Sequence, residues 1–290
     1  MPDFRAYCPT GSTGPAEKTV PRELRLDAAE SHHLVVVNRA RAGDPVVVFD
    51  GRGREWSGTL AAAGKRAAVI AIRAEHRRVA PLPCAVTLAQ ALPKGSSVMD
   101  DIVRHATELG VARIVPLETV RTQVHLEADR SGKKLGKWRA AALEACKQCG
   151  NPWLPDIAPV QTLAAFLTPS PALPASAAPA TAADADADGS GYGGDTDAGN
   201  DGVGNELRLI ASLHPGAHHL REVVAEARAL AGGLLPVRAV WLIGPEGDFT
   251  TEEMAAALAA GFRPVTLGPL VLRCDTAATS ALATLNHEML

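Results

Sequence analysis

The chain has 290 residues, of which 47% are hydrophobic, and it carries a formal net charge of −3 at pH 7. This length is sufficient for two domains, and no apolar run approaches the roughly 18 residues that are needed to span a bilayer. The amino terminus lacks the basic region and apolar segment of a secretory signal, so we expect a cytoplasmic protein with no membrane partner.

Residues 1–80 are typical of a small β-barrel. A short helix is predicted at residues 27–37, with Asp27 as its N-cap and Glu30 three positions further on. Several short strands with turn signals follow it, and this pattern favours a barrel. The predicted strands are residues 46–49, 55–60 and 67–72. The proline-rich residues 81–83 mark the boundary of this domain.

Residues 81–290 alternate between apolar strands and amphipathic helices. This alternation predicts an α/β domain with a mostly parallel sheet that is covered on both faces. The predicted strands are residues 84–88, 111–116, 207–213, 239–243 and 264–267. The predicted helices are residues 99–109, 133–149, 218–230, 251–260 and 276–288.

A stretch of Ala, Asp, Gly and Pro at about residues 168–205 interrupts the second domain. It has almost no large apolar side chain, so it cannot bury enough surface to offset its ordering entropy, and we predict a disordered insertion. Gly189, Gly191 and Gly194 match the spacing G-x-G-x-x-G of dinucleotide-binding loops. A strand must precede that motif and a helix must follow it, and neither is predicted here, so we reject this interpretation.

The charges are unevenly distributed along the chain. Residues 148–207 hold eight acidic side chains and no Lys or Arg, whereas residues 1–80 hold 13 basic and 9 acidic side chains. A basic excess in the first half is compatible with a polyanionic partner. An excess of this size is more often an ordinary solvated surface, so charge alone does not identify the partner.

The five cysteines are irregularly spaced and odd in number, which does not indicate a disulfide framework. Cys146 and Cys149 form the single C-x-x-C pair, and no second pair stands at a spacing suited to zinc. We therefore expect reduced, structural thiols and no bound metal.

Three loops in the last third of the chain carry the residues with the most distinctive chemistry. They lie at residues 213–216, 243–249 and 267–273, and each follows an apolar strand. Ligands bind beyond the carboxyl ends of the strands in open α/β sheets. Glycine beside proline gives a rigid turn whose bare backbone a flat ligand can approach. One such loop would fit an ordinary strand-to-helix turn equally well, but three together favour a binding site.

At these positions the sequence resembles the ribosomal RNA small subunit methyltransferase E family. In the last third, the resemblance rests on Gly244-Pro245-Glu246-Gly247 with Phe249, Leu267-Gly268-Pro269 with Leu272-Arg273, and Thr276-Ala277. Further upstream it rests on residues 90–95 and 107–111, on Glu144-Ala145 with Gln148 and Pro155, and on Arg5, His32-His33-Leu34 and Arg39. The likeness covers nearly the whole chain outside residues 168–205.

Two positions depart from the pattern of that family. Asp248 stands where a second glycine is more common, and Cys274-Asp275 replace a Thr-Glu pair. Aspartate keeps the negative charge of glutamate with a shorter reach, so the resemblance assigns no exact role to Asp275.

The resemblance implies a SPOUT-type α/β domain with a trefoil-knotted carboxyl-terminal segment, preceded by a PUA-like β-barrel that binds RNA. It also implies an enzyme that uses S-adenosylmethionine to methylate uracil N3 in the 16S rRNA of the small ribosomal subunit, and a homodimer paired through the knot region. The knot loops would hold the cofactor. The residues predicted to bind it are Leu213, His214, Ile243, Gly244, Pro245, Glu246, Gly247, Leu267, Gly268 and Leu272.

Uracil N3 carries a proton at neutral pH, so catalysis requires orientation and control of the developing negative charge. We expect the catalytic residues to be Arg273, which would stabilise the uracil anion, and Glu246, which would orient the cofactor or handle the proton. A Glu246 carboxylate that caps the next helix or pairs with Arg273 is at least as good an explanation, and no general base is assigned. The predicted RNA contacts are Arg5, His32, Arg39, Lys94 and Arg121.

Two alternatives keep the same fold. One is a SPOUT methyltransferase for another rRNA or tRNA site, which differs only in the nucleotide that it methylates. The other is a catalytically inactive RNA-binding relative, which would not bind the cofactor.

Overall fold

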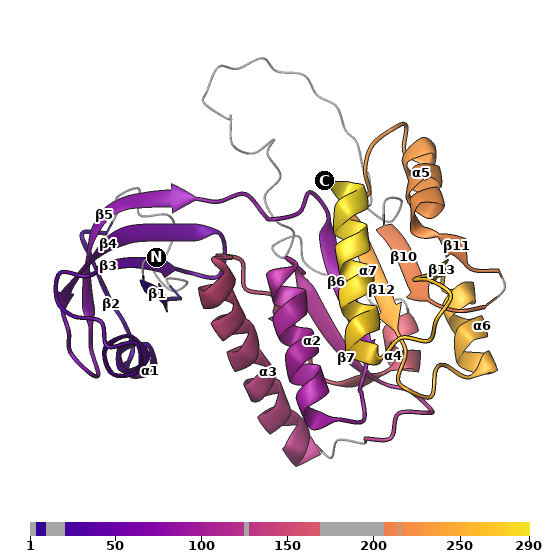
Figure 1. Ribbon diagram of the computed structural model, residues 1–290, viewed down its shortest axis with the longest axis horizontal. Helices are drawn as coiled ribbons and strands as arrows, with labels where there is room; N and C mark the ends of the chain where they lie inside the picture. Colours follow the sequence, from indigo (N-terminus) through magenta and orange to yellow (C-terminus); the bar gives the residue numbers. More distant parts are fainter. Residues whose placement is uncertain (1–3, 10–20, 125–127, 169–205, 215) are drawn as a thin grey trace. The chain divides into compact units, whose positions relative to one another are not determined.

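The computed structural model describes residues 4–9, 21–124, 128–168, 206–214 and 216–290 (Figure 1). The chain forms two compact units, which are Met1–Pro81 with Ala142–Pro155, and Leu82–Ala141 with Asp156–Leu290. The first unit thus includes a segment that the sequence analysis places in the second domain. The predicted insertion lies outside the described residues from residue 169 onward, as does the glycine motif within it.

The first unit is built on a five-stranded sheet in the order β1-β3-β4-β5-β2. The β1–β3 pair is parallel, and the other pairs are antiparallel. The strands are β1 (Phe4–Tyr7), β2 (Glu23–Arg25), β3 (Pro45–Phe49), β4 (Arg54–Ala62) and β5 (Val69–Arg77). Apolar side chains alternate along these strands, and Val48, Trp56 and Ile70 are buried together in one core.

The predicted helix at residues 27–37 is split into two kinds of helix. It begins as α1 (Ala28–His32), where the Asp27 side chain accepts the Glu30 N–H as an N-cap, and continues as a π-helix, η1 (His33–Val37). Glu30 does not return a bond to the cap, because its carboxylate accepts the Tyr7 N–H and the Lys147 ammonium instead. The helix is therefore tied to β1 by the hydrogen bond from Tyr7 and to α3 by the ion pair with Lys147, and local sequence reveals neither contact.

The second unit is built on an eight-stranded sheet. Its order is β11-β13-β10-β12-β6-β7-β8, with β9 also paired to β7, and all of these pairs are parallel. The strands are β6 (Ala85–Ala91), β7 (Arg113–Glu118), β8 (Asp156–Ile157), β9 (Gln161–Thr162), β10 (Glu206–Ala211), β11 (His218–His219), β12 (Arg238–Ile243) and β13 (Arg263–Thr266). The prediction of an α/β domain with a parallel sheet is confirmed.

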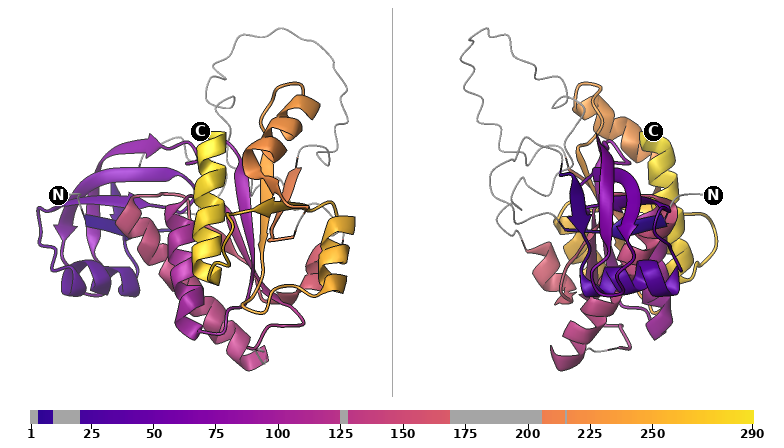
Figure 2. Two further views of the ribbon diagram at one scale, coloured as in Figure 1. Left: turned by 45° about the vertical axis from the view of Figure 1, so that its right-hand side comes forward. Right: turned by 90° about the vertical axis from the view of Figure 1, so that its left-hand side faces the viewer.

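Helices cover both faces of this sheet (Figures 1 and 2). α2 (Ser96–Glu108) and α7 (Cys274–Met289) pack side by side on one face. On the other face, α4 (Leu163–Leu167) and α6 (Thr251–Ala259) enclose a core that includes Leu242, Phe249 and Phe262. The remaining helices are α3 (Ala128–Cys149) and α5 (Leu220–Leu230). No helix in the described part of the chain is long and apolar enough to cross a membrane.

Because the strands of this sheet are parallel, the carboxyl ends of neighbouring strands meet at one edge. The ends of β6, β7, β10, β12 and β13 all lie there, and a loop leaves each of them. The three loops singled out in the sequence are three of these five. The trefoil knot predicted for this region stays a prediction.

Candidate functional site

Two loops far apart in sequence are joined by Glu246. Its carboxylate accepts the backbone N–H of Lys94, at 3.0 Å from Oε1 and 3.2 Å from Oε2. Glu246 belongs to the loop after β12, and Lys94 to the loop after β6. Neither of the structural explanations considered for Glu246 matches this contact, because the carboxylate binds a backbone amide rather than the next helix or Arg273. The carboxylate fixes the shape of the loop that carries Gly244 and Gly247.

The loop after β7 supports the same glycine loop from another side. Arg121 Nη1 donates to the carbonyl oxygens of Gly247 at 2.9 Å and Phe249 at 3.3 Å. The Val120 N–H donates to Glu253 Oε1 at 2.8 Å, while Glu253 Oε2 accepts the Thr250 N–H in a capping box at the start of α6. Glu253 was not among the predicted site residues, although the Thr250-x-x-Glu253 spacing indicates a capping box.

The structure gives different reasons for the presence of glycine at the three positions singled out in the sequence. A Cβ on Gly244 would come within 3.2 Å of the Phe249 ring, and one on Gly247 within 3.1 Å of Arg121 Cβ. Gly244 therefore allows the loop to pack closely on its own Phe249, and Gly247 allows it to pack closely on the loop after β7. Gly268 has φ +126°, and no atom of the described residues lies within 4 Å of the position of its missing Cβ. Its bare backbone faces open space, as the approach of a flat ligand requires.

Asp248 occupies the left-handed region of backbone conformation, with φ +60°. Its Oδ1 accepts the N–H of Phe249 at 2.8 Å. This conformation explains why glycine is the more common residue at this position in the family that the sequence resembles. Aspartate tolerates it because a short polar side chain can bond to the adjacent backbone.

Cys274, at the start of α7, contacts the glycine loop. Its thiol donates to the carbonyl oxygen of Gly244 at 3.6 Å. Burial, and then the nearby Glu246 carboxylate, raise the pKa of Cys274 to about 12. The thiol therefore stays protonated near neutral pH and can act as a donor, as the hydroxyl of a threonine could. Asp275 follows it in the first turn of the helix and is half-buried.

Arg273 is the exposed N-cap residue of α7, and its side chain makes no cap bond. Its guanidinium forms no ion pair or hydrogen bond with the described residues, which leaves it available to an anionic ligand. Leu267 and Leu272, at either end of this loop, are half-buried. Of the first loop, Leu213 and His214 are exposed, and His214 Nδ1 accepts the N–H of Gly216 at 3.1 Å.

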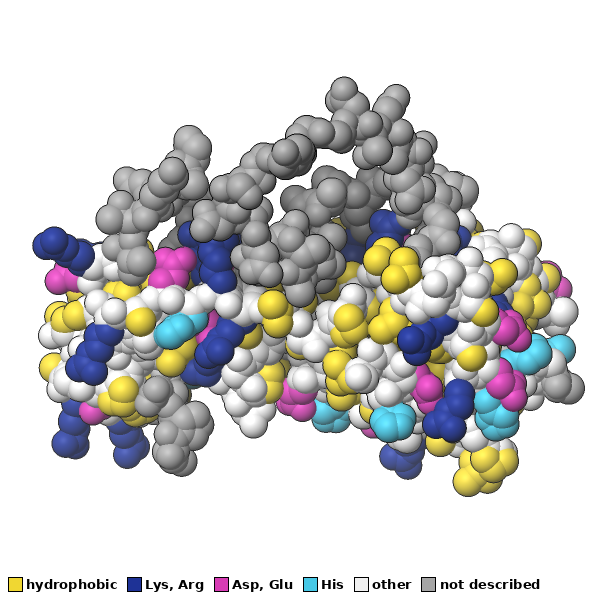
Figure 3. Space-filling model, turned by 90° about the horizontal axis from the view of Figure 1, so that it is seen from above, with side chains coloured by type: hydrophobic (Ala, Val, Ile, Leu, Met, Phe, Trp, Pro, Cys, Tyr) yellow, Lys and Arg dark blue, Asp and Glu magenta, His cyan; other side chains and the backbone are white. Residues whose placement is uncertain are grey.

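The predicted RNA contacts differ in how free their side chains are. Arg5 is paired with Glu55 at 2.6 Å and lies over the Phe49 ring, and Arg121 is bound to the two carbonyls described above. His32, Arg39 and Lys94 have exposed side chains, and Arg39 has φ +60°. On the face drawn in Figure 3, Lys and Arg side chains are interspersed with acidic and apolar ones. All five residues stay predictions as RNA contacts.

Glu30, His33 and Glu144 bring three metal-ligand atoms within 4.8 Å of one another in the first unit. Lys147 Nζ already binds this cluster, at 2.6 Å from Glu30, 2.9 Å from Glu144 and 3.1 Å from His33 Nδ1. An ammonium group therefore supplies the positive charge that these side chains require.

Comparison with protein families finds two matches. Residues 80–188 and 202–286 match an RNA methyltransferase domain, and residues 26–73 match an RNA methyltransferase PUA domain. The second match agrees with the predicted PUA-like barrel. The first covers more than half of the chain.

Curated relatives and solved structures give the same result. A protein named ribosomal RNA small subunit methyltransferase E from Synechocystis is 32% identical over 93% of this chain and 75% of its own length. The protein of the same name from Mycobacterium bovis is 30% identical over 89% of this chain and 83% of its own. A putative methyltransferase from Legionella pneumophila, solved with bound SAM, has a TM-score of 0.75 at 26% identity and covers 99% of this chain and 98% of its own. A small subunit methyltransferase E from Neisseria gonorrhoeae, bound to S-adenosylmethionine, has a TM-score of 0.73 at 25% identity, with 98% and 97% covered.

Proposed function

Because the chain belongs to the ribosomal RNA small subunit methyltransferase E family, we propose that it methylates N3 of a specific uridine in 16S rRNA. The chain is an RNA methyltransferase whose cofactor is S-adenosylmethionine. The names of its relatives support the small subunit as substrate. We propose uridine as the target base, N3 as the methylated atom and the assembled small subunit as the substrate. We also propose that the protein acts in the cytoplasm.

The loops at the carboxyl edge of the sheet fit the cofactor. Gly268 presents bare backbone to open space, and the loop from Gly244 to Gly247 is fixed by Glu246 and Arg121. Backbone N–H and C=O groups held in this way can hydrogen-bond the edge of an adenine ring. The residues proposed to line the cofactor site are those predicted from the sequence, from Leu213 to Leu272. When bound, S-adenosylmethionine supplies an electrophilic methyl group on its sulfonium.

The protein must hold the uracil in line with that methyl group and stabilise the charge that forms as N3 loses its proton. A paired uracil hides N3, so the target base must be unpaired or flipped out. Arg273 carries this part of the proposal, because it is an exposed cation beside the cofactor loop with no partner among the described residues. A guanidinium can donate to the uracil oxygens, on which the negative charge develops. Glu246 is assigned a positioning role through its bond to the Lys94 amide.

We extend the proposal to a homodimer formed through the knot region. Leu270 and Val271, in the loop before α7, are 72% and 85% exposed. Adjacent apolar side chains with this exposure are typical of a protein–protein interface. Sedimentation or light scattering would show a dimer, and Val271→Asp would convert it to a monomer.

The function is tested with labelled S-adenosylmethionine and three parallel substrates: small ribosomal subunits, bare ribosomal RNA and transfer RNA. Product nucleosides are identified by mass spectrometry. We expect 3-methyluridine in the RNA of small subunits. Label in a different nucleoside or RNA would disprove the proposed substrate. Cofactor binding without transfer to any of the three would contradict the proposed activity.

A further inference from the structure

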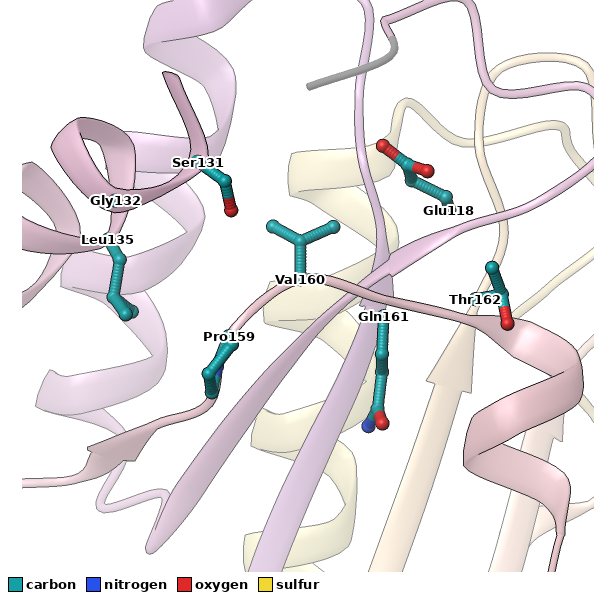
Figure 4. Close-up of a pocket in the computed structure, with 8 residues that line it drawn as sticks. All are labelled: Glu118, Ser131, Gly132, Leu135, Pro159, Val160, Gln161 and Thr162. Carbon is teal, nitrogen blue, oxygen red and sulfur yellow. The ribbon is translucent and has the colours of Figure 1, made fainter. Parts of the chain in front are cut away.

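A pocket of about 500 Å³ lies in the second unit, between β7, β9 and the beginning of α3 (Figure 4). None of the eight residues labelled there is lysine or arginine. A partner whose binding depends on positive charge is therefore not expected to bind through this lining. Arginines suited to such a partner lie instead in the first unit.

Arg54 on β4 and Arg77 on β5 lie directly opposite each other in the sheet of the first unit. Side chains of directly opposite residues point to the same face of a sheet, with Cβ atoms about 4.5–5.5 Å apart. Like charges at this separation repel each other and destabilise the pairing of the strands. An anion bound by both guanidinium groups would remove this repulsion.

The acids next to this pair in sequence are engaged by other groups. Glu55 is buried and accepts hydrogen bonds from two other arginines, each at 2.6 Å. Glu75 accepts the indole N–H of Trp56 at 3.2 Å. The side chains of Arg54 and Arg77 form no ion pair or hydrogen bond with the described residues. Both guanidinium groups are thus available to a ligand.

The charges at this end of the sheet do not balance. Residues 50–55 and 75–78 hold four arginines and three acids. Arg5 joins them through its ion pair with Glu55 at 2.6 Å. Five positive side chains against three negative ones leave an excess of two positive charges among these residues, which favours an anionic partner.

The turn that carries Arg52 and leads into Arg54 is fixed by local contacts. Asp50 Oδ1 accepts the backbone N–H groups of both arginines, at 2.7 and 3.1 Å. Trp153 packs so closely on Gly53 that a Cβ there would lie 2.3 Å from the indole ring. The side chain of Arg52 is exposed and has no partner among the described residues. Because the main chain is already ordered, less conformational entropy is lost when these side chains bind a ligand.

We propose that Arg52, Arg54 and Arg77 form an arginine surface that binds the phosphate backbone of the RNA substrate. This inference rests on the proposed function. Guanidinium groups bind phosphate oxygens through paired N–H donors. Arg52 and Arg54 lie within the segment that matches an RNA methyltransferase PUA domain. Contacts to phosphates orient a nucleic acid on a protein without reading its sequence, so this surface would hold the RNA while the second unit acts on the base.

The test is the salt dependence of RNA binding by the full chain. Filter binding with transcribed 16S rRNA is measured between roughly 50 and 200 mM KCl. Each phosphate contact to a single strand contributes about 0.7 to the slope of log K against log[salt]. The double variant Arg54→Gln with Arg77→Gln should therefore reduce the slope by about 1.4. The matched double variant with lysine at both positions keeps the charges and should keep the slope.

Arg25→Gln with Arg41→Gln is the control for a general loss of charge. Arg25 is exposed and lies at the other end of the sheet, where β2 pairs with the beginning of β5. Arg41 is an exposed residue of the loop before β3. This control removes two positive charges from the same unit and should leave the slope as in the wild type.

The melting temperature without RNA shows whether the variants are folded, and Arg54→Gln with Arg77→Gln should not lower it, because that change removes a repulsion. A folded double glutamine variant that keeps the wild-type slope, or a control that loses as much, would overturn the inference. So would weaker binding of 16S rRNA alone with unchanged binding of an unrelated RNA of equal length, since that result identifies base contacts. Failure of the proposed function would differ, because the wild type would then bind RNA with the expected slope and transfer no methyl group.

Discussion

The carboxylate of Glu246 and the backbone amide of Lys94 are hydrogen-bonded at 3.0 Å although 152 residues separate them in sequence. The bond joins the ends of β12 and β6, which are adjacent and parallel in the sheet. The loops that follow these two strands are thus held together at the edge of the sheet. A residue selected from the sequence as a catalytic candidate has a structural contact that accounts for its position.

The Glu246 contact predicts a difference between two variants at its two ends. Glu246→Ala removes the acceptor and should weaken binding of S-adenosylmethionine about tenfold, since a hydrogen bond to a charged group contributes about 1.5–3 kcal/mol. Lys94→Ala keeps the backbone N–H and should leave cofactor affinity unchanged. Isothermal titration calorimetry measures both. Equal losses in the two variants would mean that the Lys94 side chain, and not the amide, supports the site.

Arg121 should contribute to cofactor binding although its side chain is exposed. Arg121→Ala removes two bonds to the carbonyls of Gly247 and Phe249, and we expect a severalfold weaker affinity for S-adenosylmethionine. Arg121→Lys should rescue this only in part, because an ammonium lacks the planar fork of a guanidinium. If Arg121→Ala weakened RNA binding but left cofactor affinity intact, its role as an RNA contact would be the correct one.

The architecture of the second unit could be predicted from sequence because strong local patterns specify it. Apolar strands such as β12 and amphipathic helices such as α2 are evident from periodicity alone. The short strands β8, β9 and β11 have two residues each and leave no periodic signal. The four residues of β1, which pairs with β3, are also too few to give a clear periodic signal. Such elements exist only because neighbouring strands supply hydrogen bonds.

The loops of the candidate site were found from sequence, but the contacts that hold them were not. Glycine and proline beside apolar strands indicate turns, and that signal is local. The partners of Glu246 and Arg121 lie more than 120 residues away, at Lys94 and Gly247, and depend on the order of the strands. A single sequence does not encode that order in any local pattern.

Cys274 should be replaceable by threonine but not by valine. The thiol donates to the Gly244 carbonyl, and a threonine hydroxyl can make the same bond. Cys274→Thr should therefore keep the affinity for S-adenosylmethionine within about twofold. Cys274→Val, which matches threonine in shape and lacks the donor, should weaken it by about five- to tenfold. Calorimetric titrations of the two variants would contradict this contact if they gave the same affinity.

Alkaline pH should destabilise the second unit through Cys84. Burial, with a smaller effect of Glu206, raises the pKa of Cys84 from 9.0 to about 12. Between these values the unfolded chain releases the thiol proton while the folded protein keeps it, so stability is lost as the pH rises from about 9 towards about 12. Urea unfolding across this interval should show a shallower loss for Cys84→Ala than for the wild type. The exposed Cys149 provides the control, since Cys149→Ala should follow the wild type.

Arg273 should affect catalysis and not the binding of the cofactor or the stability of the fold. Its side chain is exposed and forms no ion pair or hydrogen bond with the described residues, so Arg273→Ala should keep the melting temperature and the affinity for S-adenosylmethionine. Loss of one group that stabilises a developing oxyanion lowers kcat by about a hundredfold or more, and we expect a loss of that size with small ribosomal subunits. Arg273→Lys keeps the positive charge but lacks the planar fork of a guanidinium, so its kcat should lie between those of the wild type and Arg273→Ala.

Arg228→Ala, at an exposed arginine near the end of α5, is the control for a general loss of positive charge. A variant at position 273 with normal kcat and a raised KM for RNA would instead identify Arg273 as a substrate-binding residue, because removal of uniform binding changes KM and leaves kcat unaltered.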